Sequence, residues 1–298
     1  MRNINICLSC DDNYAPFAGV VIVSALLNSA KDEKLTFYVL QSGLSEDNKE
    51  KLLFLKKIKE CEINFIEIPQ DSIEQFKKIK TLAHITIPAY YRLMIASFIK
   101  DIDRILYLDC DVIVEKSLSE FYFSDFGDNF CAGVRDLNLG KTKFYVNSGV
   151  LLFNLKYWRE KNAEKMIFEH IEKNQSTIVL GDQQVLNEVF AGKILELPPM
   201  WNVQTLNFYS FSNYEPKYGI IHFIGTSKPW LFGSFMPFKR KYFYYLSKTP
   251  WGAPDFFWRV VSNIYSYLRY LKRVPFFFLR PRFFLALKNA MIRSFFAD

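Results

Sequence analysis

Residues 105–114, ILYLDCDVIV, form an apolar run that carries two carboxylates in its middle. A β-prone run of this kind predicts a buried central strand. Burying a charged side chain costs free energy unless an opposite charge or hydrogen bonds compensate it, so two acids in a buried strand need such a partner. Asp109 and Asp111 are two residues apart, and on a strand both side chains would therefore leave the same face.

Two carboxylates held this close repel each other, and one of them would take up a proton unless a cation lay between them. Oxygen ligands of this kind suit Mn²⁺ or Mg²⁺. The alternative is that the strand ends at Leu108 and the two acids lie in a solvated turn. An Asp-x-Asp pair by itself does not decide between the two interpretations.

The composition is typical of a folded protein of the cytoplasm. The chain has 298 residues, half of them hydrophobic, which suffices for one large domain with an appendage or for two small domains. We expect no signal peptide, because Asp11 and Asp12 interrupt the first apolar run. Five scattered cysteines favour reduced thiols. Cys7 and Cys10 lack a second pair that would complete a zinc site, so we predict inert core thiols.

The charge is concentrated at one end of the chain. Residues 255–298 hold eight basic residues against two acids, a net charge of +6 out of +7 for the whole chain, and thirteen aromatic residues lie among them. We therefore divide the chain into a nearly neutral domain, 1–252, and a basic, aromatic, helical tail, 253–298.

Within this tail, residues 260–274 and 281–296 predict two amphipathic helices, each too short and too charged to cross a bilayer. Such helices suit the surface of an anionic membrane. The alternative is that their aromatic side chains complete the core or a dimer contact.

The body of the chain alternates between strand and helix patterns. The first five predicted elements are strand 5–9, helix 17–29, strand 36–41, helix 45–59 with Ser45 as N-cap, and strand 63–68. This order predicts an α/β fold with a mainly parallel sheet and right-handed crossovers. The later predicted elements are helices at 89–98, 118–123 and 157–173 and from 181, and strands at 130–134, within 145–155 and at 219–225.

Ligands of such sheets bind beyond the carboxyl ends of the strands. The polar loop at residues 11–13 and the Asp109/Asp111 pair both follow such ends, so we expect them to meet.

Six segments in this order resemble glycosyltransferase family 8, and most closely the bacterial galactosyl- and glucosyltransferases that build lipopolysaccharide or lipooligosaccharide chains. The resemblance covers about residues 4–252. It is carried by Asp11-Asp12-Asn13-Tyr14, Ile87–Leu93, Tyr107–Asp111, Asn147–Leu152, Asp182-Gln183, and His222–Gly225 followed by Lys228-Pro229-Trp230. It implies a single Rossmann-like nucleotide-sugar-binding domain of the GT-A type. It also implies transfer with retention from a manganese-bound UDP-galactose or UDP-glucose.

The resemblance implies a metal site made of Asp109, Asp111 and His222, completed by diphosphate oxygens. A divalent cation there would neutralise the leaving group. For His222 the alternative is an ordinary core histidine. Gly225 would let the backbone approach a phosphate. Lys228 would place a charge on the diphosphate, or else be a solvated surface lysine.

The resemblance also assigns residues to the two ends of the donor. At the nucleotide end, Asp11 and Asn13 look like uracil and ribose contacts, and Tyr14 like a ring that stacks on the uracil. Asp11 is alternatively a helix cap. The remaining donor-site assignments are Ser9, Cys110, Arg92, Asp136 and Asn147, of which Arg92 and Asp136 are alternatively an ordinary ion pair.

Asp182 and Gln183 match the pair nearest the anomeric carbon, although an acid is also favoured at any helix N-terminus. Retention is possible through a side-chain nucleophile or through front-face attack. We favour front-face attack, steadied by Gln183 and Asp182, because a neutral amide is a poor nucleophile. His84 matches an acceptor-side position, or is simply a surface residue.

Two other functions are compatible with parts of the sequence. A metal-dependent nucleotidyltransferase would require a glycine-rich phosphate loop where residues 11–14 stand. A non-catalytic, membrane-peripheral protein would bind sugar nucleotides through a catalytically inactive site. We expect no nucleic-acid partner, because the body is nearly neutral and lacks a recognised motif. The expected partners are a UDP-sugar, a lipid-linked saccharide acceptor and an anionic membrane, which together predict a peripheral protein on the inner face of the cytoplasmic membrane.

Overall fold

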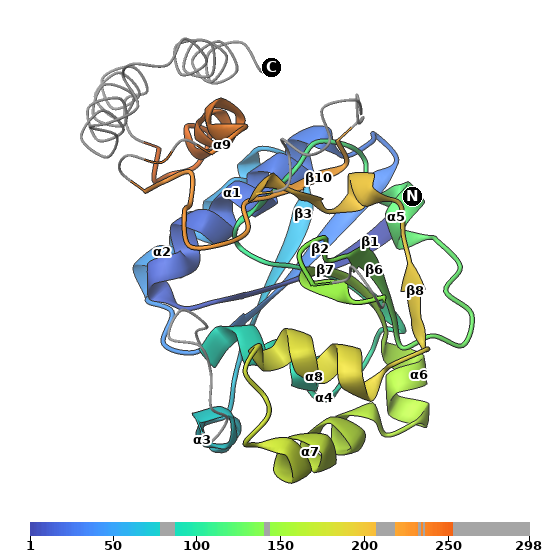
Figure 1. The fold of residues 1–298 in the computed structure, drawn as a ribbon. Helices are drawn as coiled ribbons and strands as arrows, with labels where there is room; N and C mark the ends of the chain where they lie inside the picture. Colours follow the sequence, from blue (N-terminus) through green and yellow to red (C-terminus); the bar gives the residue numbers. More distant parts are fainter. Residues whose placement is uncertain (78–86, 140–143, 207–217, 232–233, 235, 253–298) are drawn as a thin grey trace, which may run out of the picture.

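The structure, a computed structural model, describes residues 1–77, 87–139, 144–206, 218–231, 234 and 236–252. Within these residues the centre is a seven-stranded sheet with the order β3-β2-β1-β4-β7-β6-β8 (Figure 1). The bounds are β1 (Arg2–Cys10), β2 (Glu33–Gln41), β3 (Cys61–Glu67), β4 (Arg104–Leu108), β6 (Cys131–Arg135), β7 (Val146–Asn154) and β8 (Ile194–Glu196). Only β7 runs antiparallel to its neighbours, β4 and β6, among the described pairs of this sheet. The predicted α/β fold with a mainly parallel sheet is confirmed.

The sheet is apolar on both faces because both faces are covered. Ile6 and Leu8 of β1 belong to one core cluster, and Cys7 between them belongs to the other. The first cluster includes residues of α1 (Ala15–Asn28), α2 (Glu46–Phe54), α5 (Ser119–Tyr122) and α9 (Lys239–Leu246). The second includes residues of α4 (Ile95–Phe98), α6 (Leu155–Glu160), α7 (Ala163–Asn174) and α8 (Gly181–Val189). Figure 1 shows the two groups of helices on opposite sides of the sheet.

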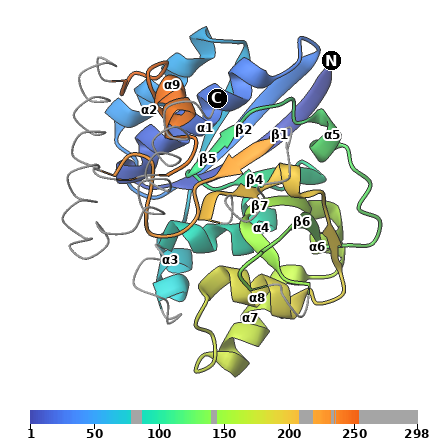
Figure 2. The same ribbon diagram turned by 45° about the horizontal axis from the view of Figure 1, so that its top comes forward.

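A second, smaller sheet lies beside the first and contributes directly to the site. It consists of β5 (Val112–Val114), β10 (Ile220–His222) and β9 (Val203–Gln204), in the order β5-β10-β9. Figure 2 labels β5 of this sheet next to β4 of the first. β10 pairs antiparallel with β5, which places His222 opposite Val112. This register brings a histidine from late in the chain next to the Asp109–Asp111 segment.

The prediction of one continuous strand across residues 105–114 was wrong. β4 ends at Leu108, residues 109–111 form a turn, and β5 belongs to the other sheet. The turn is held from both sides, since the Asp109 N–H donates to Gly149 O and the Phe223 N–H to Asp111 O. The alternative interpretation was right that the strand ends at Leu108, but its solvated turn was wrong, since the side chains of Asp109 and Asp111 are only 27% and 14% exposed.

Three predicted helices differ from the structure in their extent. The predicted helix 157–173 is divided, because Asn162 adopts a left-handed backbone (φ 51°) between α6 and α7. The predicted helix 89–98 is mostly a 3₁₀ helix, Ile87–Met94, followed by α4. The predicted helix 45–59 is α2 followed by a 3₁₀ turn, Leu55–Lys57, and the Ser45 Oγ accepts from the Asn48 N–H at 3.3 Å, which confirms the N-cap.

The five cysteines are all buried, free thiols. Burial raises the pKa of the Cys7 and Cys131 thiols, which agrees with the prediction of inert core thiols. The predicted tail, with its two amphipathic helices, and His84 lie outside the described residues. The helices in the described part of the chain are all too short or too polar to cross a bilayer.

Two short 3₁₀ helices carry polar side chains toward the carboxyl ends of β1 and β4, where the candidate site lies. The first, Ile87–Met94, comes after the small helix α3 (Gln70–Lys77) and carries Arg92 into the protein with 2% of its surface exposed. The second, Pro199–Trp201, precedes β9 and has Asn202 at its end. Arg92 and Asn202 thus reach the same region from opposite halves of the chain.

Candidate active site

A cavity of about 470 Å³ lies where β1 and β4 end. Its size is typical of a small-molecule site. Its lining includes these predicted site residues: Ser9, Asp11, Tyr14, Arg92, Asp109, Cys110, Asp111, Asn147, Asp182, Gln183, His222, Gly225 and Lys228. Asn13 and Asp136 are not part of the lining. The structure thus brings together most of the residues that the sequence assigned to one site.

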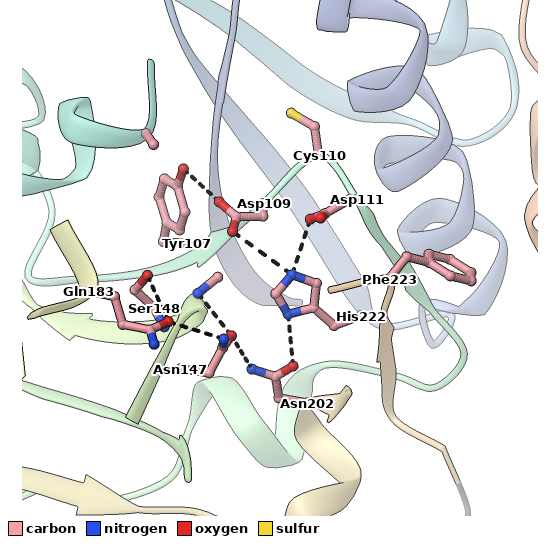
Figure 3. Close-up of polar contacts among 12 residues, drawn as sticks. Tyr107, Asp109, Cys110, Asp111, Asn147, Ser148, Gln183, Asn202, His222 and Phe223 are labelled. Carbon is pink, nitrogen blue, oxygen red and sulfur yellow. Dashed lines mark hydrogen bonds and ion pairs between the residues drawn. The ribbon is translucent and has the colours of Figure 1, made fainter. Parts of the chain in front are cut away.

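Asp109, Asp111 and His222 form a candidate metal site (Figure 3). One ligand atom from each lies within 4.8 Å of the others. His222 Nε2 is 3.1 Å from Asp111 Oδ1 and 3.9 Å from Asp109 Oδ2. Asp111 Oδ1 is buried and accepts no hydrogen bond from the residues that the structure describes. Two carboxylates and an imidazole with such an unsatisfied oxygen fit a divalent cation such as Mn²⁺ or Mg²⁺.

Gly149 makes room for this cluster. A Cβ on Gly149 would lie 2.3 Å from His222 Cε1 and 2.4 Å from Asp109 Oδ2. Any larger residue would therefore push two of the three candidate ligands apart. Sequence reasoning noted the Asn147–Leu152 segment but did not assign Gly149 to the site, because its importance depends on a contact with residues 40 and 73 positions away.

Lys228 is paired with Asp111 of the candidate metal site rather than solvated. Its Nζ donates to Asp111 Oδ2 and, at 2.7 Å, to Phe223 O, and its side chain is 18% exposed. Burial by itself would raise the pKa of Asp111, but the Lys228 ammonium beside it lowers that pKa well below its usual range. Asp111 is therefore ionised at neutral pH.

Arg92 connects three parts of the site from beneath. Its Nε donates to Ala89 O at 2.7 Å and its Nη1 to Ser148 O at 2.5 Å. Its Nη2 donates to Asp109 Oδ1 at 2.7 Å. The carboxylate of Asp182 lies 3.1 Å from Nε as an ion pair without a hydrogen bond, since the hydrogen on Nε already points to Ala89.

The alternative pairing of Arg92 with Asp136 was therefore wrong, because the partners of Arg92 are Asp109 and Asp182. Burial and the charge of Asp109 raise the pKa of Asp182, and Arg92 only partly offsets this.

Gln183 is held in place by hydrogen bonds on both ends of its amide. Its Oε1 accepts from the Ser148 N–H at 3.0 Å and from Asn147 Nδ2 at 3.1 Å, and its Nε2 donates to Asp136 Oδ2 at 3.1 Å. Asp136 lies outside the cavity lining and contributes to the site by holding the Gln183 side chain. An amide oxygen that already accepts two hydrogen bonds is an even poorer nucleophile than a free one.

The loop at residues 11–14 closes the other end of the cavity. Asp11 Oδ1 accepts from the Tyr14 N–H at 3.0 Å, so the capping role exists, and Asp11 also lines the cavity. Asp12 Oδ1 accepts from Ser45 and Asn48, which ties this loop to α2.

Beside this loop, aromatic rings form one wall of the cavity. Tyr14 meets Phe17 edge-on, and Phe17 stacks on Trp230, with ring centroids 3.8 Å apart. Trp230 lines the cavity but was not assigned to it from the sequence. Asn13 is exposed and lies outside the lining.

The model of glycosyl transferase family 8 matches residues 5–233. The chain belongs to glycosyltransferase family 8. Its curated relatives include the general stress protein A of Bacillus subtilis, 31% identical over 83% of this chain and 94% of the relative. They also include the lipopolysaccharide 1,3-galactosyltransferase of Salmonella typhimurium, 29% identical over 83% of this chain and 79% of the relative.

The solved structures that this family member resembles include the galactosyltransferase LgtC in complex with donor and acceptor sugar analogues. The TM-score is 0.75 at 27% identity, over 87% of this chain and all of that one. Membership of the family confirms the resemblance seen in the sequence and leaves the nucleotidyltransferase interpretation without support.

Proposed function

We propose that this glycosyltransferase moves a hexose, galactose or glucose, from a UDP-sugar to a saccharide acceptor of the lipopolysaccharide or lipooligosaccharide type. The observation that carries the proposal is the convergence of Asp109, Asp111 and His222 at one end of a cavity that also holds Lys228 and Gln183. The choice of a hexose and of this acceptor class rests on the relatives, one of which is named a lipopolysaccharide 1,3-galactosyltransferase and another, from Escherichia coli, a lipopolysaccharide 1,2-glucosyltransferase.

Asp109, Asp111 and His222 would hold Mn²⁺ or Mg²⁺. When bound, the cation supplies charge that neutralises the departing diphosphate. Lys228, 18% exposed and next to Asp111, adds a second positive charge on the same side of the cavity. Tyr14, on the nucleotide side, offers an aromatic ring for the uracil.

Transfer with retention by front-face attack fits the side chains around Gln183. Gln183 is neutral, and its amide is fixed by Ser148, Asn147 and Asp136. Asp182 is 4% exposed and paired with Arg92, which lowers its availability as a nucleophile. The two side chains then serve to stabilise positive charge developing on the sugar, while the departing phosphate accepts the proton of the acceptor hydroxyl.

The test is a donor screen. The protein is incubated with Mn²⁺ and a panel of UDP-sugars, and the UDP released by transfer or slow hydrolysis is measured. We expect release from UDP-galactose or UDP-glucose, and none when EDTA replaces Mn²⁺. Binding of UDP-sugars without any release, with or without a saccharide acceptor, would instead favour a non-catalytic sugar-nucleotide-binding protein.

Stereochemistry is read from the same reaction. The anomeric proton of the product, observed by NMR, should show an α-linkage formed from an α-linked donor. A covalent sugar adduct on Asp182 or Gln183, detected by mass spectrometry in active protein, would replace front-face attack with double displacement.

A further inference from the structure

The hydrogen bonds beneath the candidate metal site have a direction that two backbone N–H groups determine. The Gly149 N–H donates to Asn147 Oδ1 at 3.2 Å, and the Ser148 N–H donates to Gln183 Oε1 at 3.0 Å. A backbone N–H only donates, so both of these side-chain oxygens are acceptors. The amide nitrogens must then point the other way, Asn147 Nδ2 to Gln183 and Gln183 Nε2 to Asp136.

This direction extends through Asn202 to His222. Asn202 approaches Asn147 Oδ1 at 2.9 Å, and because that oxygen accepts, Asn202 must present its Nδ2 there. The Asn202 Oδ1 is left facing His222 Nδ1 at 3.0 Å. An amide oxygen only accepts, so the proton of the imidazole lies on Nδ1. Asn202 and His222 are 2% and 3% exposed, so bulk water does not compete for these bonds.

In a neutral imidazole with its proton on Nδ1, the lone pair of Nε2 points at Asp111 Oδ1, 3.1 Å away (Figure 3). In that form neither of these two atoms brings a hydrogen, and a third acceptor, Asp109 Oδ2, lies 3.9 Å from Nε2. This is the arrangement of a ligand set for a cation, and the opposite tautomer would aim an N–H into it.

We propose that Asn202 is a positioning residue with two functions. Its Oδ1 fixes His222 in the tautomer that offers Nε2 as a ligand, and its Nδ2 holds Asn147, which in turn holds Gln183. A single carboxamide thus ties the metal end of the cavity to the residue nearest the transferred sugar. The proposal rests on the proposed function, since it assigns Asn202 to the same site.

Two variants distinguish the hydrogen bond of Asn202 to His222 from its hydrogen bond to Asn147. Asn202→Leu removes both hydrogen bonds at similar volume. Asn202→Asp keeps an acceptor for the His222 Nδ1–H but turns a carboxylate oxygen toward Asn147 Oδ1. Losing a hydrogen-bond partner behind a metal-ligating histidine typically costs about 10- to 100-fold in metal affinity. Asn129→Leu is the matched control, because Asn129 is a part-buried amide that donates to Phe126 O, outside the cavity lining.

The first measurement is made without metal. Since the chain has three histidines, ¹⁵N-detected NMR with a His222→Gln reference assigns the His222 ring. At a pH where the ring is neutral, we expect a protonated Nδ1 and an unprotonated Nε2 in the wild type and in Asn202→Asp, and a mixture of tautomers in Asn202→Leu. A neutral wild-type ring with its proton on Nε2 overturns the proposal.

The second measurement is the affinity for Mn²⁺, followed by electron paramagnetic resonance of the free ion. Asn202→Leu should lose about 10- to 100-fold, because His222 loses the partner that orients its ring. Asn202→Asp should retain affinity within about threefold while the kcat of UDP release falls about tenfold or more, because Asn147 and Gln183 lose their support. Equal Mn²⁺ affinities in the wild type, Asn202→Leu and Asn129→Leu overturn the proposal.

A failure of the proposed function has a different signature. In that case the wild type itself binds no Mn²⁺ and releases no UDP from any UDP-sugar. The NMR measurement still decides whether Asn202 sets the His222 tautomer.

Discussion

Gly149→Ala tests the geometry of the site with a single methyl group. The added Cβ would lie 2.3 Å from His222 Cε1 and 2.4 Å from Asp109 Oδ2, whereas ordinary contacts begin at 3.4 Å. Each of these groups must therefore retreat by about 1 Å. Metal–ligand distances tolerate only about 0.2 Å, so the displacement exceeds what the site can absorb.

The magnitude follows from that displacement. A 1 Å misplacement of reacting or binding groups costs about 100-fold in rate, equivalent to about 2.7 kcal/mol. We expect the kcat/KM of UDP release to fall by at least this factor and Mn²⁺ affinity to fall with it. Overpacking adds about 1–3 kcal/mol of lost folding stability, which urea unfolding measures separately.

The control for this variant is Gly192→Ala. Gly192 has φ +76°, and an added Cβ there would meet no atom of the described residues within 4 Å, so alanine strains the backbone without touching the site. We expect a stability loss of about 1–2 kcal/mol and unchanged turnover. Turnover and Mn²⁺ affinity of Gly149→Ala within about threefold of the wild type would refute the reasoning, since the misplacement predicts about 100-fold.

Three further predictions concern other parts of the chain. Arg92→Lys keeps the charge but loses the fork that reaches Ala89, Ser148 and Asp109 together, so the kcat/KM of UDP release should fall about 10- to 100-fold; an unchanged kcat/KM would contradict this. Burial raises the pKa of Glu33, but hydrogen bonds from Ser117, Ser119 and Ala30 lower it by more, to below its usual value of 4.5. The stability that Glu33 contributes is therefore complete above about pH 4.5 and is lost as the pH falls through the pKa that Glu33 has in the folded protein. In Glu33→Gln the free energy of unfolding, measured with urea at a series of pH values, should fall less steeply at acid pH than in the wild type. The same decrease in both proteins would contradict this. Deleting residues 253–298 should abolish binding to anionic liposomes, to which each basic residue contributes about 1 kcal/mol, and leave UDP release from donor unchanged; a truncated protein that still binds the liposomes would contradict this.

The alternation of strands and helices was predictable because it depends on local patterns. The apolar runs of β1, β2 and β3, separated by helical segments, specify a parallel sheet whatever the rest of the chain does. The Asp109/Asp111 pair was recognisable for the same reason, since two acids inside an apolar run stand out locally.

Local patterns offered a strand end at Leu108 only as the alternative and could not decide in its favour. Residues on both sides of Asp109–Asp111 are apolar and β-prone, so the run resembles one strand. What ends it is pairing with distant partners, Gly149 on one side and Phe223 on the other. Hydrogen bonds between segments this far apart leave no mark on the local sequence.

Asn202 was missed for a related reason. It follows a proline-rich 3₁₀ turn, where an asparagine is common, and the pairing of β9 with β10 then places it against His222. Gly149 and Trp230 lay inside recognised segments, but their roles depend on contacts across the cavity. Residues that support a site from behind are identified from the packing rather than from the spacing.

The most direct test of a metal-dependent transfer site is the rate of UDP release with Mn²⁺ by the wild type and by Asp109→Ala, Asp111→Ala and His222→Ala, on protein whose fold is verified by circular dichroism. We expect that release by the wild type requires Mn²⁺, that all three variants lose it, and that all three stay folded. Release by the wild type in EDTA, or turnover of folded His222→Ala at the rate of the wild type, would contradict it.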